Sequence, residues 1–196
     1  MTAAKPVKPV KTIKAAKPAK TTKPAKSVTP AKLAKSIKPI KVWRIATENK
    51  KYLATDLGGK GAALSPGRWN ELGLPVLYTA GTVALATLET VAHINAGGIP
   101  QMKYLISVDI DALSWKQREI LEPKDLPSRW DAIPHEAMTG VIGSDWLKQC
   151  RSLVLCVPSA IAPEETVVLI NPLHPSAATL VAEKIRLVDY KTVLRS

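Results

Sequence analysis

Seven side chains in five short segments of the chain are of the types that hold a nucleotide and stabilise a sugar cation. They are Arg44, Arg68, Trp69, Asn70, Tyr78, Glu89 and Ser159. The planar guanidinium of an arginine makes two charge-assisted hydrogen bonds to phosphate oxygens and keeps its proton. Arg44 and Arg68 are therefore the candidates for binding a pyrophosphate. Gly67 would let the backbone approach a ligand, and the indole of Trp69 could stack on a planar ring.

Glu89 falls within a mostly apolar stretch, residues 83–94, that we expect to form a helix. The expected apolar stripe of this helix runs through Leu85, Leu88, Ala92 and Ala96. Glu89 borders that stripe, so its carboxylate either points to solvent or turns into a polar cleft. In a cleft, the carboxylate would stabilise the positive charge that develops on a ribose when its glycosidic bond breaks.

Ser159 follows Val157 and Pro158 at the end of an apolar segment, where a hydroxyl could cap the next turn or bond an amide. The Gly-x-Ser-x-Gly context of a serine nucleophile is missing around it. Glu89 and His93 are four residues apart on one helix, but one Glu and one His fall short of the three protein ligands of a catalytic zinc. We therefore expect no metal site and a structural role for His93.

The order and spacing of these residues resemble those of the RES-domain toxins of bacterial RES–Xre toxin–antitoxin pairs. The segments that carry the resemblance are Arg44, Gly67 to Asn70, Tyr78, Glu89, Val157-Pro158-Ser159 and Asn171 to Pro175. The resemblance covers residues 42–190. The chain departs from the family at Pro66, where the family commonly has a glycine, and Ser176 competes with Ser159 for the role of the family's serine.

The resemblance implies a mixed α+β domain with an ADP-ribosyltransferase-like fold that cleaves NAD at the bond between nicotinamide and ribose. NAD would be a substrate, and no prosthetic group is expected. Glu89, Arg44 and Ser159 would be catalytic, and both arginines, Trp69, Asn70, Tyr78 and Ser159 would bind the dinucleotide. Water, phosphate or a protein could accept the ADP-ribosyl group, so a glycohydrolase, a phosphorylase and an ADP-ribosyltransferase all stay open. A cognate Xre-type helix-turn-helix antitoxin is the expected partner.

The elements that must position these residues follow a mixed pattern. We expect strands at 42–46, 76–79, 104–110, 153–157, 167–170 and 185–188. Thr82 is the expected N-cap of the helix that carries Glu89, and Gly97-Gly98 its stop. A short helix is expected at 145–149, whereas no element is assigned to residues 113–142. Strands with helices interposed indicate a mixed sheet.

The charge of the chain is concentrated at its N-terminus. The formal net charge is +12, and 28 residues are basic against 16 acidic. Residues 1–41 contain lysines at a spacing of three, together with prolines and no Asp, Glu or Arg. We expect this tail to be disordered and residues 42–196, in which basic and acidic residues balance, to form one domain.

The tail has two functional interpretations and one trivial one. Lysines on an extended chain can neutralise phosphates, which predicts weak, non-specific binding of nucleic acid. A nucleic-acid-binding protein that acts through this tail is the alternative to an enzyme; a solvated leader or a start codon assigned too far upstream would carry no function.

No apolar run is long enough for a secretory signal or a membrane span, and Cys150 and Cys156 form no disulfide framework or metal motif. We therefore expect a cytoplasmic protein with buried thiols.

Overall fold

The computed structural model describes residues 38–50, 52–93 and 102–190, which all lie in the unit Ile37–Ser196. The strands are β1 (Ile40–Thr47), β2 (Leu77–Ala80), β3 (Lys103–Ile110), β4 (Glu119–Ile120), β5 (Val154–Pro158), β6 (Thr166–Ile170) and β7 (Val181–Leu187). The α-helices are α2 (Lys60–Leu64), α3 (Val83–Ala92), α4 (Ala112–Lys116) and α5 (Ala137–Gln149), and two 3₁₀ turns are η1 (Pro123–Asp125) and η2 (Pro175–Thr179).

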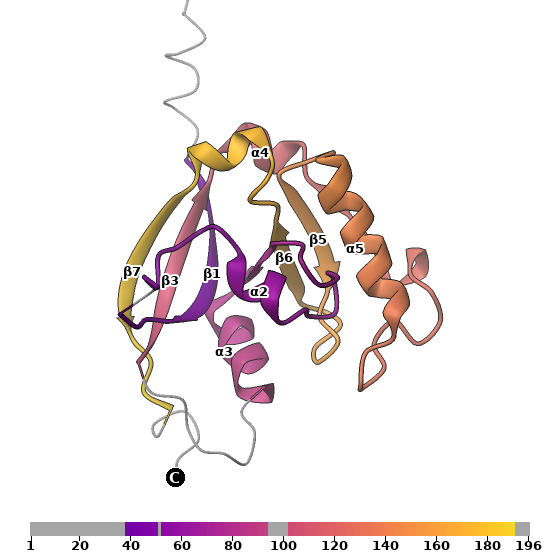
Figure 1. Cartoon of the computed structure of the whole chain (residues 1–196), viewed down its shortest axis with the longest axis horizontal. Helices are drawn as coiled ribbons and strands as arrows, with labels where there is room; N and C mark the ends of the chain where they lie inside the picture. Colours follow the sequence, from indigo (N-terminus) through magenta and orange to yellow (C-terminus); the bar gives the residue numbers. More distant parts are fainter. Residues whose placement is uncertain (1–37, 51, 94–101, 191–196) are drawn as a thin grey trace, which may run out of the picture. The chain divides into compact units, whose positions relative to one another are not determined.

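The strands form one seven-stranded sheet in the order β4-β5-β6-β2-β1-β3-β7 (Figure 1). Neighbouring strands are antiparallel except for β4 and β5, which are parallel. The mixed α+β class and the mixed sheet are therefore confirmed. All six expected strands are present, with ends that differ by a few residues, and β4 is added at the edge.

The sheet is split at its middle, between β1 and β2. These two strands share the single register pair Trp43 and Ala80, whereas β1 pairs with β3 along its whole length. Beyond this pair, β1 continues to Arg44, and the part of the antiparallel strand β2 on the same side contains Tyr78. Because the strands are not paired beyond this point, side chains from both strands can face a space between them.

Strands β5 and β6 are apolar at nearly every position because both of their faces are buried. In β5, Val154 and Cys156 belong to one core cluster, and Leu155 and Val157 belong to a second one. The second cluster includes Trp146 of α5, so this helix covers one face of β5 and β6, as Figure 1 shows. A strand covered on both sides is apolar at every position rather than at alternate ones.

Helix α3 begins as expected, but its buried side is not the expected one. Thr82 Oγ1 accepts a hydrogen bond of 3.1 Å from the backbone N–H of Leu85, which confirms the N-cap. The predicted apolar stripe is wrong at Leu88 and Ala92, which are exposed, whereas Leu85 is buried as predicted, together with Ala86. The helix packs through its first turns beside the split in the sheet, so the side that carries Glu89 turns inwards. Ala96 and the predicted stop at Gly97-Gly98 lie outside the described residues.

The unassigned segment contains α4, β4, η1 and the first turn of α5. Helix α5 starts at Ala137 rather than at Asp145, and its early turns hold Gly140 and Gly143, which are weak helix formers. A Cβ atom at Gly143 would collide with the Trp69 carbonyl oxygen. The sequence therefore predicts this part of the helix poorly, because its glycines allow close packing and do not favour helix formation.

Strand β1 begins two residues before the expected start of the domain at Val42. Ile40 and Lys41 belong to β1, and Lys41 Nζ lies 2.8 Å from Asp109 Oδ1 of β3. The tail prediction for residues 1–37 falls outside the described residues. Within the described residues, no helix has the length and apolar character needed to cross a membrane.

Candidate functional site

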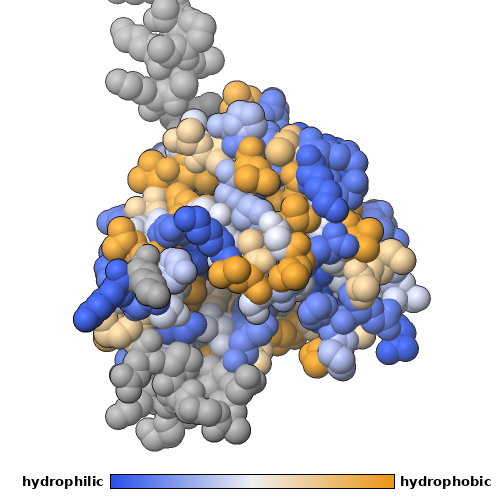
Figure 2. Space-filling view, viewed as in Figure 1, coloured by the Kyte–Doolittle hydropathy of each residue, from blue (hydrophilic) through white to orange (hydrophobic). Residues whose placement is uncertain are grey.

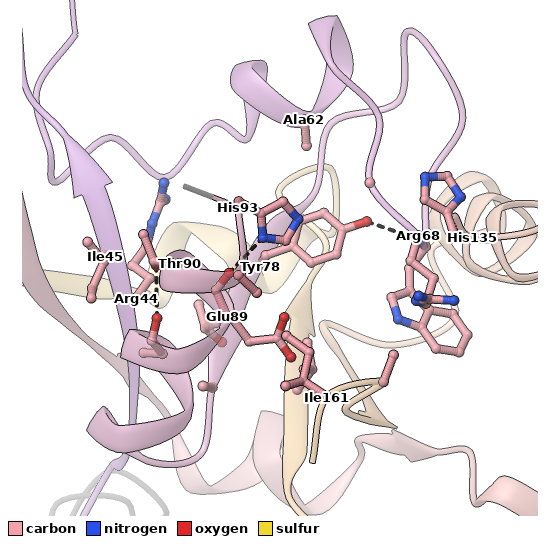
Figure 3. Close-up of a pocket in the computed structure, with 18 of the residues that line it drawn as sticks. Arg44, Ile45, Ala62, Arg68, Tyr78, Glu89, Thr90, His93, His135 and Ile161 are labelled. Carbon is pink, nitrogen blue, oxygen red and sulfur yellow. Dashed lines mark hydrogen bonds between the residues drawn. The ribbon is translucent and has the colours of Figure 1, made fainter. Parts of the chain in front are cut away.

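A pocket of about 750 Å³ opens where β1 and β2 separate, which is within the size range of small-molecule sites. Five of the seven predicted site residues line it: Arg44, Arg68, Trp69, Tyr78 and Glu89. The two arginines stand on opposite sides of the pocket with Glu89 between them (Figure 3). The other two predicted residues, Asn70 and Ser159, are buried behind its wall.

The Glu89 carboxylate is held in place by Ser159. The Ser159 hydroxyl donates a 2.7 Å hydrogen bond to Glu89 Oε1, and its oxygen accepts from the backbone N–H groups of Ile161 and Ala162, each at 3.1 Å. A serine hydroxyl has one proton and two lone pairs, so these bonds use its full capacity. Among the described residues nothing donates to Glu89 Oε2, and this oxygen is available to a ligand.

Arg44 lies on β1 just past the residue where β1 leaves β2. Its Nη1 donates to the backbone oxygen of Asp56 at 3.2 Å, which is the guanidinium's one hydrogen bond within the described part of the chain. Burial lowers the pKa of Arg44, and the nearby Asp56 carboxylate opposes this shift. Arginine still stays protonated at neutral pH. Arg44 therefore brings a desolvated positive charge and unused donors to the pocket.

Arg68 uses its donors differently. One terminal nitrogen donates to the backbone oxygen of Trp130 and the other to that of Ala132, at 2.5 and 3.0 Å. Burial lowers its pKa, and the charges of Asp131 and Glu89 act against this shift. The side chain thus fastens the 130–132 segment to the edge of the pocket while its charge faces Glu89.

Asn70 organises the loop that precedes β2. Its Oδ1 accepts from the backbone N–H of Gly67 at 3.0 Å and from the Tyr78 hydroxyl at 2.8 Å. Its Nδ2 lies 2.9 to 3.2 Å from three backbone carbonyl oxygens, those of Ala62, Leu74 and Glu71. Because both polar atoms of the amide bond backbone groups or Tyr78, Asn70 holds the pocket wall in shape.

Tyr78 and Trp69 complete that wall. The Tyr78 hydroxyl accepts from the Trp69 backbone N–H at 2.9 Å, and burial raises the pKa of Tyr78 well above its ordinary value. The hydroxyl therefore remains a donor to Asn70 at any physiological pH. Trp69 is only 3% exposed and belongs to the same core cluster as Trp146, so little of its surface is open for stacking.

The remaining predicted groups have local roles. His93 Nδ1 lies 2.6 Å from the backbone oxygen of Glu89, one helical turn earlier. His174 Nδ1 accepts from the Ser176 backbone N–H at the start of η2, and Ser176 is not among the pocket-lining residues. The described residues contain no group of three His, Cys, Asp or Glu side chains arranged for a metal. Of the two free cysteines, Cys156 is buried and Cys150 partly so.

Among the lysine, arginine and carboxylate side chains that line the pocket, one was not predicted from the sequence. Lys103, the first residue of β3, lines the pocket on the same side as Arg44. Burial and the neighbouring Arg44 charge both lower its pKa. A single lysine at the start of a strand is common, so nothing in its sequence context distinguished it.

A comparison with known families matches residues 41–192 to the RES domain. The chain belongs to the RES-domain family. The predicted membership is thereby confirmed. The match includes all seven predicted site residues, and it includes Lys41, in agreement with the position of that residue in β1.

Similar proteins of the RES family carry toxin names. The Prs ADP-ribosylating toxin of Sphingobium sp. is 45% identical over 144 residues, which make up 74% of this chain and 89% of that protein. Toxin Res of Pseudomonas putida is 34% identical over 152 residues, or 76% of this chain and 94% of that protein.

A solved structure shares the RES fold. A chain of the Mycobacterium tuberculosis MbcT–MbcA toxin–antitoxin complex superposes with a TM-score of 0.60 over 80% of this chain and 88% of that one. The two sequences are 15% identical, so this likeness shows the fold alone.

Proposed function

We propose that this RES-domain protein is a toxin that consumes NAD by breaking the bond between nicotinamide and ribose. The observation that carries the proposal is the Glu89 carboxylate, fixed by the buried Ser159 and facing a pocket lined by Arg44. The toxin names of the relatives support it. A fixed anion opposite a desolvated cation suits a substrate in which a cationic sugar forms next to a pyrophosphate.

Glu89 would act on the sugar. When the bond between the ribose C1′ and nicotinamide breaks, the bonding electron pair leaves with the pyridinium nitrogen, and nicotinamide departs neutral. The positive charge that remains is shared by C1′ and the ring oxygen of the ribose. Glu89 stabilises this charge, and Ser159 acts through Glu89 by holding the carboxylate in one position.

The pyrophosphate would bind to Arg44. Its remaining N–H groups can form the bidentate contact that a phosphate favours. Arg68 has both terminal nitrogens committed to backbone carbonyls, so its contribution is to position the 130–132 segment and to add positive charge near the site. The sequence predicts that both arginines bind the pyrophosphate, whereas this proposal assigns the pyrophosphate to Arg44 and a supporting role to Arg68.

The acceptor would enter after nicotinamide leaves. It attacks C1′ and loses a proton, so water yields ADP-ribose, phosphate yields a phosphorylated ADP-ribose, and a protein side chain becomes ADP-ribosylated. The name of the Sphingobium relative favours the protein acceptor as the second candidate function. The first bond-breaking step is the same in all three cases.

We also propose a cognate antitoxin of the Xre-type helix-turn-helix class as partner and the cytoplasm, where NAD is abundant, as location. The structural neighbour comes from a toxin–antitoxin complex, which supports an antitoxin in general. Weak binding of nucleic acid by the lysine tail remains a separate prediction.

The test is to incubate the purified full chain with NAD and identify every product by chromatography and mass spectrometry. Parallel reactions contain no phosphate, added phosphate, or a cell extract probed for ADP-ribosylated proteins. Release of nicotinamide that Glu89→Gln abolishes supports the proposal, and the second product identifies the acceptor. Intact NAD in all three reactions would contradict it.

A further inference from the structure

A second cavity of about 400 Å³ adjoins the pocket, and the two share part of their lining. The shared residues are Arg44, Ile45 and Lys103. The rest of the second cavity is formed by the end of β1, the loop that follows it, and α2. A ligand that reaches beyond Arg44 from the side of Glu89 therefore enters the second cavity.

Two cations meet at the junction of the cavities. Lys103 pairs with Thr47 in the sheet register, so it stands beside the end of β1, near Arg44. Among residues 38–50, 52–93 and 102–190, no hydrogen bond or ion pair joins the Lys103 ammonium to a partner. The repulsion from Arg44 that lowers the pKa of Lys103 would be relieved by an anion between them.

The second cavity carries an excess of positive charge. Its described lining has three cations, Arg44, Lys103 and Lys60, and one carboxylate, that of Asp56. Asp56 Oδ1 accepts a 2.6 Å hydrogen bond from the backbone N–H of Gly58, so this carboxylate is partly engaged within its own turn. One carboxylate leaves the cluster of cations under-compensated, which favours an anionic ligand.

The same cavity also presents apolar surface. Tyr52, Leu53 and Leu64 line it with 46%, 67% and 75% of their surface exposed. Figure 2 shows hydrophobic surface over α2 beside strongly hydrophilic surface. Cations next to an exposed aromatic ring and two aliphatic side chains match the chemistry of a nucleoside attached to phosphates.

We propose that Arg44 and Lys103 together bind the pyrophosphate of the dinucleotide at this junction, and that the second cavity holds its adenosine. The inference rests on the proposed function, and it adds Lys103 and Tyr52 as residues that determine specificity for a nucleoside diphosphate. Nicotinamide and its ribose lie on the Glu89 side of the junction, and adenine lies on the Tyr52 side. Lys60 adds charge at the entrance to the second cavity.

The experiment measures binding of ADP and of inorganic pyrophosphate to the full chain by calorimetry. Neither probe contains nicotinamide, so neither depends on the cleavage step. The variants are Lys103→Gln, Lys103→Arg and Tyr52→Ala. The matched control is Lys116→Gln on α4, which removes one charge from an exposed lysine that lines neither cavity. Every variant keeps the lysine tail, so the tail contributes equally to each measurement.

Lys103→Gln is expected to lower the affinity for both ADP and pyrophosphate about tenfold, the effect of losing one charge-assisted hydrogen bond. Lys103→Arg should retain most of the affinity. Tyr52→Ala should weaken ADP a few-fold, roughly the value of one aromatic contact, and leave pyrophosphate unchanged. The KM for NAD should rise in Lys103→Gln in parallel with the ADP dissociation constant.

Unchanged ADP affinity in Lys103→Gln, or an equal loss in Lys116→Gln, would overturn the pyrophosphate site. An equal loss of affinity for ADP and for pyrophosphate in Tyr52→Ala would overturn the adenosine assignment. The proposed function is judged separately by nicotinamide release. If the protein cleaves NAD and Lys103→Gln leaves the KM for NAD unaltered, the proposed function stands and this inference fails. If ADP binds as expected but NAD stays intact, this inference stands and the proposed function fails.

Discussion

The two sides of the pocket contain similar polar residues and use them in opposite ways. On the side of β1 and α3, Arg44 uses one nitrogen for a backbone contact and Glu89 keeps one carboxylate oxygen available. On the side of the 67–70 loop, both terminal nitrogens of Arg68 and both polar atoms of Asn70 are engaged with the protein itself. The first side keeps hydrogen-bonding groups available, and the second uses its groups to hold the pocket wall.

This contrast shows that a residue's type does not reveal its role. Arg44 and Arg68 are equally suited to a phosphate, and Arg68 even stands in the more suggestive context, between Gly67 and Trp69. Its donors are nevertheless taken by carbonyls of a segment 62 and 64 residues away along the chain. The unsatisfied donors of the folded state, rather than the motif, indicate where a ligand binds.

The largest effect is expected at Glu89. Glu89→Gln keeps the size and removes the charge, so nicotinamide release should fall by about 100-fold or more because the transition state loses its electrostatic stabilisation. The circular dichroism spectrum should stay unchanged. Glu164→Gln, an exposed glutamate outside the pocket lining, is the matched control. Normal turnover in folded Glu89→Gln would remove Glu89 from the mechanism.

Ser159→Ala should have the next largest effect. Without the 2.7 Å bond from Ser159 the carboxylate is no longer fixed, and misplacement of a catalytic group costs on the order of tenfold to 100-fold in rate. The loss should appear in kcat, with little change in KM for NAD. Ser107→Ala, a buried serine of β3, tests for a general stability effect. A fall in thermal stability with unaltered kcat would assign Ser159 to structure only.

The two arginines provide the most direct test of the contrast. Arg44→Lys should raise the KM for NAD about tenfold, because lysine keeps the charge and loses the bidentate fork. Arg68→Lys should instead lower the free energy of unfolding by about 1–2 kcal/mol, since one of two backbone carbonyls loses its donor. Urea denaturation and steady-state kinetics on both variants separate these effects. Equal changes in KM would show that both sides of the pocket bind the ligand.

Asn70→Asp should act on stability. The substitution is nearly isosteric but replaces the donor that faces the carbonyls of Ala62 and Leu74 with an acceptor. We expect a loss of roughly 2 kcal/mol in the free energy of unfolding. Gln117→Glu, the corresponding amide-to-carboxylate change at an exposed position that lines neither cavity, is the comparison. A stable Asn70→Asp variant with impaired NAD binding would move Asn70 to the ligand side.

The smallest effect on chemistry is expected from removal of the tail. A chain that begins at Ile37 keeps Ile40 and Lys41 of β1, and it should release nicotinamide at the rate of the full chain. Its affinity for duplex DNA should fall, and the salt dependence should flatten by about 0.9 in log-log slope for each phosphate that the tail no longer neutralises. Equal DNA binding by both chains would show that the tail is not the polyanion clamp.

Much of the fold follows from local patterns. β5 and β6 are short apolar runs bounded by polar residues and proline, and the Thr82 N-cap is a contact within four residues, so both could be predicted. The buried side of α3 could not, because that helix lies beside a split in the sheet and turns a carboxylate inwards. The start of α5 was hidden by Gly140 and Gly143, whose absence of side chains serves close packing with the 68–70 loop.

The sequence by itself determined the family, the mixed class of the fold and five of the side chains that line the pocket. Tertiary structure alone decided which of them remain available to a ligand. Ser159 reaches Glu89 across 70 residues of chain, and Lys103 joins Arg44 through strand pairing. Hydrogen bonds and burial over such separations depend on how the strands and helices pack, and local residue patterns contain no record of that packing.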